Sequence, residues 1–236
     1  MLWSARAVAK SRCMSTGISI QEAVKQAKFM NTSCRDETIQ VAMRLNVDPR
    51  KPNQSVRGSV CLPHGLGKKI SVAVFATGKA AQDARSAGAD FVGAEDLAQS
   101  ITEGNVNFDR CIATPDMLGV VGRVARILGP RGLMPNVKLG TVCKDVASAI
   151  KSAKQGQVEF RAEKMGIVHA PLAKTSFSLE HIEDNLNELI RAIQDAKPSG
   201  AKGNYIRGAT LTSNRGHAVP LDVSVKPFTM RKTSNR

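Results

Sequence analysis

The chain has 236 residues, of which 42% are hydrophobic and 23% charged, and its 34 Lys+Arg against 20 Asp+Glu give a formal net charge of +14. Such a composition excludes a disordered tail, and the length suffices for one large domain or two of roughly 100 residues each. The positive charge recurs in every third of the chain, which favours a nucleic-acid partner. Because no apolar run approaches the ~20 residues of a spanning helix, we expect no membrane partner.

The five cysteines and four histidines are widely spaced and form no pattern typical of metal ligands. We therefore expect reduced, structural cysteines, with no metal and no cofactor.

The first 18 residues have the composition of a transit peptide, since they contain Arg6, Lys10 and Arg12 and no acidic residue. We expect import into the mitochondrion and a mature N-terminus between Met14 and Ile20. A plastid address and an ordinary basic tail are the alternatives.

The segment after this leader predicts an α+β pattern. Ser19 to Glu22 forms a capping box that predicts the start of a helix. Strict alternation from Thr38 to Val47 predicts a strand with one solvated face, and a second strand is expected from Val56 to Leu62.

From about residue 70 to 155 the pattern becomes one of short apolar strands alternating with helices, which predicts parallel strand pairs covered by helices. Thr114 and Pro115 are expected to open one of these helices as its N-cap and first residue. The expected strands are Val72–Phe75, Phe91–Val92 and Phe108–Ala113, and the expected helices are Lys79–Ala87, Ala94–Glu103, Thr114–Leu128 and Lys144–Gln155.

The stretch from Leu128 to Asn136, followed by Lys138 and Gly140, contains two prolines that exclude helix and central strand. We expect a stiff loop that presents Arg131, Lys138 and free backbone N–H groups to an anionic partner such as phosphate. A helix-ending loop with solvated basic residues is the alternative.

The last third returns to the α+β pattern. A long helix with an apolar stripe is expected to serve the core. The expected elements are strands at Val158–Arg161, Gly166–Ala170, Tyr205–Ser213 and Leu221–Val225, with the helix at Ser178–Lys197.

The run G-P-R-G-L-M-P-N, followed by K-x-G-T, resembles the signature of the ribosomal protein L-one family, the universal large-subunit stalk protein, in its bacterial and organellar form. Asp36-Glu37-Thr38, Asp48 to Lys51 and Leu62 to Gly65 agree with family segments in the same order, and the resemblance runs from about Ser19 to about Val225. It implies a discontinuous α+β domain from residues 19–69 and 156–230, with an inserted, Rossmann-like, three-layer α/β domain at residues 70–155.

The resemblance implies a structural constituent of the large ribosomal subunit, which binds the stalk region of large-subunit ribosomal RNA and takes part in release of exit-site tRNA. Because bacterial members also repress their own messenger, a free RNA-binding translational repressor is the alternative. An enzyme is the rival class, but no G-x-G-x-x-G follows Val72–Phe75 and no complete P-loop is present. We expect no catalytic activity and no small-molecule substrate.

The resemblance places the main RNA contacts at Asp36-Glu37-Thr38 and at the turn Asn214-Arg215-Gly216, where the family commonly has T-M-G. Strand hydroxyls suit recognition of RNA through 2′-hydroxyls and phosphates, and Gly216 is expected to let backbone approach the sugar edge. The expected RNA-binding residues are Arg35, Asp36, Glu37, Thr38, Arg57, Arg131, Lys138, Lys202, Thr210, Thr212, Ser213, Asn214, Arg215 and Gly216.

Overall fold

The computed structural model describes residues 17–29, 36–201 and 203–223. The helices are α1 (Ile20–Phe29), α2 (Lys79–Ser86), α3 (Glu95–Thr102), α4 (Leu118–Leu128), α5 (Val146–Lys154) and α6 (Leu179–Asp195), with 3₁₀ turns η1 (Pro52–Gln54), η2 (Pro115–Met117) and η3 (Val137–Leu139). The strands are β1 (Thr38–Leu45), β2 (Arg57–Cys61), β3 (Val72–Phe75), β4 (Phe91–Gly93), β5 (Arg110–Ala113), β6 (Gln157–Arg161), β7 (Ile167–Lys174), β8 (Ile206–Ser213) and β9 (Val219–Leu221). Within these ranges no helix is long and apolar enough to cross a membrane.

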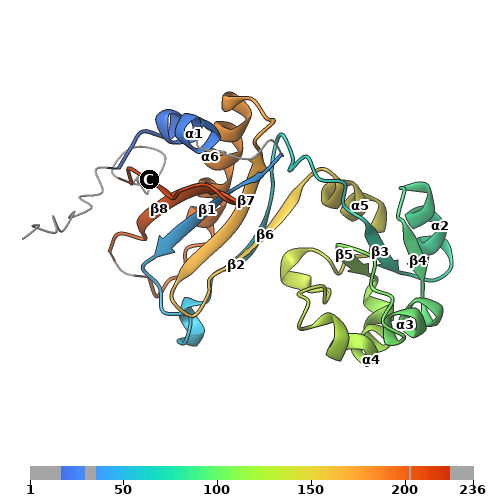
Figure 1. Cartoon of the computed structure of the whole chain (residues 1–236). Coiled ribbons are helices and arrows are strands. Elements are labelled where there is room, and N and C mark those ends of the chain that lie inside the picture. Colours follow the sequence, from blue (N-terminus) through green and yellow to red (C-terminus); the bar gives the residue numbers. More distant parts are fainter. Residues whose placement is uncertain (1–16, 30–35, 202, 224–236) are drawn as a thin grey trace, which may run out of the picture.

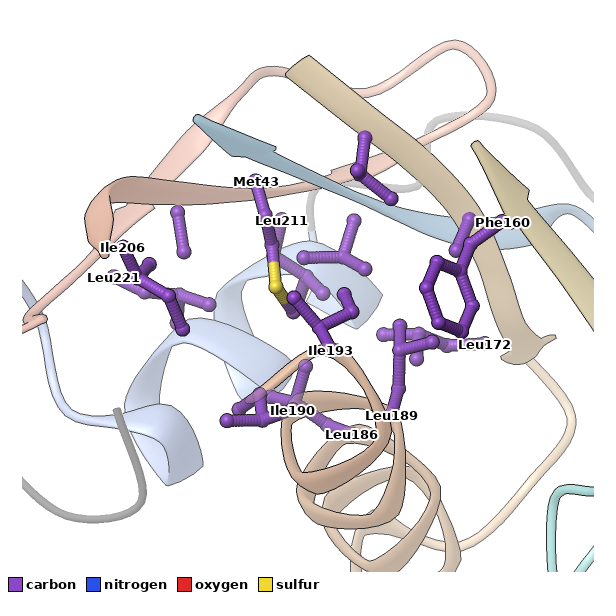
Figure 2. Close-up of a cluster of buried hydrophobic side chains, with 14 of the residues drawn as sticks. Met43, Phe160, Leu172, Leu186, Leu189, Ile190, Ile193, Ile206, Leu211 and Leu221 are labelled. Carbon is purple, nitrogen blue, oxygen red and sulfur yellow. The ribbon is translucent and has the colours of Figure 1, made fainter. Parts of the chain in front are cut away.

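An antiparallel sheet in the order β7-β1-β8-β9 combines strands from both ends of the chain. The alternation predicted for β1 is confirmed, because Ile39, Val41, Met43 and Leu45 are all buried. Figure 1 shows α1 and α6 on one side of this sheet, and Figure 2 shows Met43 and residues of β8 and β9 directed toward the apolar face of α6. The opposite face of the sheet carries side chains that are exposed or half-buried.

The predicted start of α6 is also confirmed, because the Ser178 side chain accepts a hydrogen bond from the backbone N–H of His181. The Ser19 hydroxyl likewise accepts from the Glu22 N–H at the start of α1, at 3.4 Å. In both α1 and α6, a serine therefore accepts a hydrogen bond from one of the backbone N–H groups that have no partner within the helix.

Strands β2 and β6 form an antiparallel ribbon in which Arg57 lies opposite Arg161. Its inward face carries Val60, Val158 and Phe160, and the Phe160 ring lies so close to Gly58 that a Cβ there would be 2.7 Å from the ring. An isolated bridge at the end of β6 connects the ribbon to β7. The ribbon therefore continues the surface of the larger sheet.

The predicted α/β unit is present as a parallel sheet in the order β4-β3-β5. Helices α3 and α4 bury one face around Phe75, Ile101 and Leu128, and helices α2 and α5 bury the other around Val74 and Ile150. All four residues of β3 are buried, as expected for a central strand covered by helices on both faces.

The buried apolar residues form clusters that draw on different parts of the chain. One core cluster draws on residues 23–62 and 158–221, whereas the clusters on the two faces of the parallel sheet lie within residues 72–153. The mixture of antiparallel and parallel sheets fits the expected α+β class.

Several predicted boundaries are wrong: β7 continues to Lys174 where Ala170 was expected, and β5 begins at Arg110 and not at Phe108. The last strand begins at Val219 and not at Leu221, because Val219 and Leu221 are both buried in the pairing with β8; residues 224 and 225 of the expected strand lie outside the described residues. Pro220 is tolerated because β9 lies at the sheet edge.

Thr114 and Pro115 do open a helical turn as expected, but it is the 3₁₀ turn η2, and α4 begins only at Leu118. The buried Thr114 hydroxyl donates to the Phe75 carbonyl at 3.4 Å and makes no side-chain cap.

Candidate nucleic-acid interface

Three threonines lie on the sheet face that the core does not use. In the register, Ala42 is opposite Thr210 and Gln40 is opposite Thr212, while Thr38 begins β1. All three threonine side chains are half-buried, so the sheet brings hydroxyl groups from distant parts of the sequence onto one surface. We call this surface, formed by Thr38, Gln40, Ala42, Thr210 and Thr212, the open sheet face.

Glu37 has a different position from the one expected, because it is only 7% exposed. Its Oε2 accepts a hydrogen bond from the backbone N–H of Arg215 at 3.3 Å, and its own N–H donates to Thr175 Oγ1 at 3.2 Å. The carboxylate thus holds the 214–216 turn against the start of β1 and does not present a free oxygen at the surface. Asp36, directly before it, is exposed.

The expectation that Ser213 offers its hydroxyl to RNA is wrong. Ser213 is 3% exposed, its Oγ has no hydrogen-bond partner, and alternation along β8 places it on the core side, opposite Ile39. A Cβ added to Gly216 would lie 2.2 Å from this Oγ, so the turn's own packing disfavours any larger residue at position 216 while the Ser213 side chain keeps this rotamer. Close approach of a ligand therefore does not by itself explain Gly216.

The rest of the turn is accessible. Asn214 and Arg215 are exposed, and the Gly216 N–H donates to the Ser213 carbonyl at 3.3 Å. Arg35 and Lys202, also expected to bind RNA, lie outside the described residues. Asp36, Thr38 and the 214–216 turn thus meet at one end of the open sheet face, although they lie far apart in the sequence.

The proline-containing loop is more internally bonded than the sequence predicts. Backbone N–H groups of Gly132, Leu133 and Asn136 donate to Leu128, Gly129 or Thr141 within the loop and its flanks. Lys138 lies in the η3 turn, which corrects the prediction of an entirely irregular loop. Because these N–H groups are already used, the loop does not offer a row of free donors to phosphate.

Arg131 lies on the α/β part of the chain and lines a cavity of about 360 Å³ together with Asp109, Arg110 and Glu159. Arg110 bridges to β6, donating to the Gln157 carbonyl at 2.6 Å and pairing with Glu159 at 3.3 Å. The Lys68 ammonium, which binds Asp109 at 2.7 Å, lowers the pKa of that carboxyl. Arg131 thus comes from the α/β part of the chain, and the cavity that it lines extends to β6 and to Pro171, which is opposite Gln40.

Arg57, one of the expected RNA-binding residues, is exposed on β2, and the structure places beside it basic residues that the sequence did not indicate. Arg161 is directly opposite Arg57, and a concavity of about 980 Å³ beside Arg161 is lined by Arg50, Lys164 and His169 among others. All five side chains are exposed. No sequence pattern could bring them together, because the pairing of β2 with β6 joins segments about a hundred residues apart.

A comparison with protein families agrees with this geometry. The model of the ribosomal protein L1p/L10e family matches residues 23–217, which extend from α1 through the 214–216 turn. The match includes Asp36–Thr38, the loop of Arg131 and Lys138, and strand β8. The chain belongs to the ribosomal protein L1p/L10e family.

Proposed function

We propose that the protein is a structural constituent of the large ribosomal subunit and binds the stalk region of large-subunit ribosomal RNA. The observation that carries this proposal is that Thr38, Thr210 and Thr212 share the open sheet face, with the exposed Arg215 at the end where Thr38 lies. Hydroxyl groups and a cation on a shallow surface suit the 2′-hydroxyls and phosphates of folded RNA. The net charge of +14 supplies long-range attraction to the same partner.

The proposal includes a two-domain arrangement, with a discontinuous domain of residues 19–69 and 156–230 and an inserted domain of residues 70–155. Its support is the separation of the core clusters along the chain. The chain passes between the two groups of elements in short segments around residues 62–71 and 154–157, and the Arg110 contacts with Gln157 and Glu159 add a non-covalent connection. In this arrangement the inserted domain is free to take part in exit-site tRNA release while the discontinuous domain holds the stalk.

The proposed location is the mitochondrial matrix. Residues 1–16, which include most of the leader, lie outside the described residues. Ile18 forms two backbone hydrogen bonds beside β9: its N–H donates to the Pro220 carbonyl, and its carbonyl accepts from the Asp222 N–H. Cleavage before Gly17 would keep these bonds. Sequencing the N-terminus of protein purified from mitochondria tests the proposal, and retention of Met1 in most molecules would contradict it.

We also propose that the protein has no catalytic activity and binds no nucleotide. The first turn after β3 reads Ala76-Thr77-Gly78-Lys79, without the repeated glycines that bring a helix N-terminus to a pyrophosphate. Titration with ATP and NAD tests this, and affinity in the micromolar range or tighter would restore the enzyme hypothesis.

Filter-binding titrations with a stalk RNA fragment test the RNA site. Arg215→Ala should reduce the slope of log K against log salt by about one unit, because one fewer counterion is released on binding. Arg131→Ala is the matched control, since Arg131 is also an exposed arginine but lies on the α/β part. If Arg131→Ala abolishes RNA binding and Arg215→Ala leaves it unchanged, the assignment of the RNA site to the open sheet face is wrong.

Cosedimentation with large subunits distinguishes a ribosomal constituent from a free repressor of its own messenger. We expect the protein to sediment with large subunits at physiological salt. A protein found only in the soluble fraction, bound to its own messenger, would favour the repressor.

A further inference from the structure

Two arginines face each other across the β2–β6 ribbon without any carboxylate between them. Arg57 and Arg161 are direct partners in the register, and both are exposed. Among the described residues neither guanidinium forms an ion pair, and the nearby Glu159 is engaged by Arg110 at 3.3 Å. Like charges directly opposite on one face of a ribbon destabilise it, so the pair makes no contribution to folding that would account for it.

Further basic residues surround this pair. Arg50, Lys164 and His169 line the adjoining concave surface, and within the described part of the chain none of the three takes part in an ion pair. Two carboxylates line the same surface: Glu159, which Arg110 engages at 3.3 Å, and the exposed Glu163. We call Arg50, Arg57, Arg161, Lys164 and His169 the basic patch.

The basic patch adjoins the open sheet face. His169 is opposite Ala42 in the register of β1 with β7, and its side chain lies on the same side of the sheet as those of Ala42 and Thr210. Ala42 follows Thr38 by four residues, which is roughly 14 Å along an antiparallel strand. A single folded RNA could therefore reach both surfaces, since phosphates line both edges of a groove of comparable width.

We propose that the basic patch binds the phosphate backbone of folded RNA at a second position, with Arg57 and Arg161 placed on either side of the phosphates. This inference rests on the proposed RNA-binding function and adds a separate contact to it. The anion would offset the repulsion between the two guanidinium groups, and arginine's planar donors suit phosphate oxygens. An acidic protein is the competing partner, but the continuity with the open sheet face favours RNA.

The test compares Arg161→Gln with Arg191→Gln, which removes one exposed arginine from α6 on the opposite side of the sheet, where it pairs with Glu188 at 3.3 Å. With a long stalk RNA, Arg161→Gln should lower the salt slope of log K by about one unit and Arg57→Gln/Arg161→Gln by about two. Arg191→Gln should leave the slope unchanged. Arg161→Lys should keep the salt slope of the unaltered protein, because it keeps the charge, although it lacks the planar donors of arginine.

The stability of Arg161→Gln is a second measurement, and it distinguishes a binding role for Arg161 from a role in folding. Because the pair is repulsive in the free protein, Arg161→Gln should leave the urea midpoint unchanged or raise it while it weakens RNA binding. A lowered midpoint with an unchanged salt slope would overturn the proposal. So would equal slopes for Arg161→Gln and Arg191→Gln, or a patch-dependent complex with an acidic polypeptide but not with RNA.

Titration with a shortened stalk fragment and with tRNA identifies the source of the second contact. If Arg161→Gln changes the salt slope with the long stalk RNA but not with the shortened fragment, the second contact is made by the same ribosomal RNA. If Arg161→Gln changes the affinity for tRNA, the contact is made by a second RNA molecule. If the unaltered protein binds no stalk RNA, the proposed function fails. If Arg215→Ala changes the slope and Arg161→Gln does not, only the present inference fails.

Discussion

The carboxylate of Glu37 accepts a hydrogen bond from the backbone N–H of Arg215 at 3.3 Å, joining two segments that are 178 residues apart in the chain. Glu37 is buried, and the exposed residues on both sides of the contact, Asp36 and Arg215, are those expected to meet RNA. The bond therefore positions the candidate interface without being part of its surface.

Replacing Glu37 by alanine should destabilise the protein by about 1–3 kcal/mol, because the partly buried hydrogen bond from the Arg215 N–H to the charged carboxylate is lost. Urea denaturation measures this change. Glu37→Gln is the control, since its amide oxygen can still accept from Arg215. We expect Glu37→Ala to weaken stalk RNA binding as the 214–216 turn loses its anchor, and equal binding by the two variants would refute this positioning role.

Gly216→Ala should destabilise the protein, and adding Ser213→Ala should restore most of the lost stability. A Cβ at position 216 would overlap the Ser213 Oγ, whereas the Ser213 Cβ would remain at 3.4 Å, an ordinary contact. Overpacking of this kind costs about 1–3 kcal/mol, and removing an unpartnered buried hydroxyl costs little.

Thermal or urea unfolding of both single variants and the double variant measures the coupling. RNA titration of the double variant then separates folding from recognition. If it folds normally and binds RNA poorly, Gly216 also admits the ligand; if it binds normally, the glycine serves only the turn. Additive destabilisation in the double variant would show that the two side chains do not collide.

Replacing Asn185 should lower the stability of the protein more than replacing most other polar residues. Asn185 is fully buried in α6, its Nδ2 donates to the carbonyls of Leu172 at 2.9 Å and Gly65 at 3.1 Å, and its Oδ1 accepts from the His64 N–H at 3.2 Å. Asn185→Leu would leave three backbone groups unpaired and should cost about 3 kcal/mol or more. Asn187→Ala, at a half-buried position of the same helix, should change stability by less than about 0.5 kcal/mol. Comparable urea midpoints for the two variants would contradict the argument.

The described cysteines should differ sharply in reactivity. Burial raises the pKa of Cys111 to about 12, so its thiol stays protonated at mildly alkaline pH, whereas Cys61 is exposed. Because the thiolate is the nucleophile, iodoacetamide should label Cys61 and spare Cys111 in the folded protein. Peptide mass spectrometry measures the labelling, and denatured protein, in which both should react, is the control. Rapid labelling of Cys111 before unfolding would show that β5 opens readily.

Local features of the sequence determined most of the secondary structure. The alternation in β1, the apolar stripe of α6 and the serine caps of α1 and α6 depend on residues within one or two turns of each other, so sequence spacing was enough. The same alternation, applied to β8, would also have placed Ser213 with Ala209 and Leu211 on the buried side. Residue type alone had instead suggested grouping Ser213 with the exposed threonines.

Only the tertiary structure decided how distant segments meet. The contact of Glu37 with Arg215, the opposition of Arg57 and Arg161, and the overlap of a Gly216 side chain with Ser213 all depend on strand register or on the path of a turn. Register is set by the packing of whole sheets against α1 and α6, because a slip of one residue would reverse which side chains are buried. The sequence therefore identified the segments that carry the candidate interface, and the packing of the sheets decided which of their side chains reach its surface.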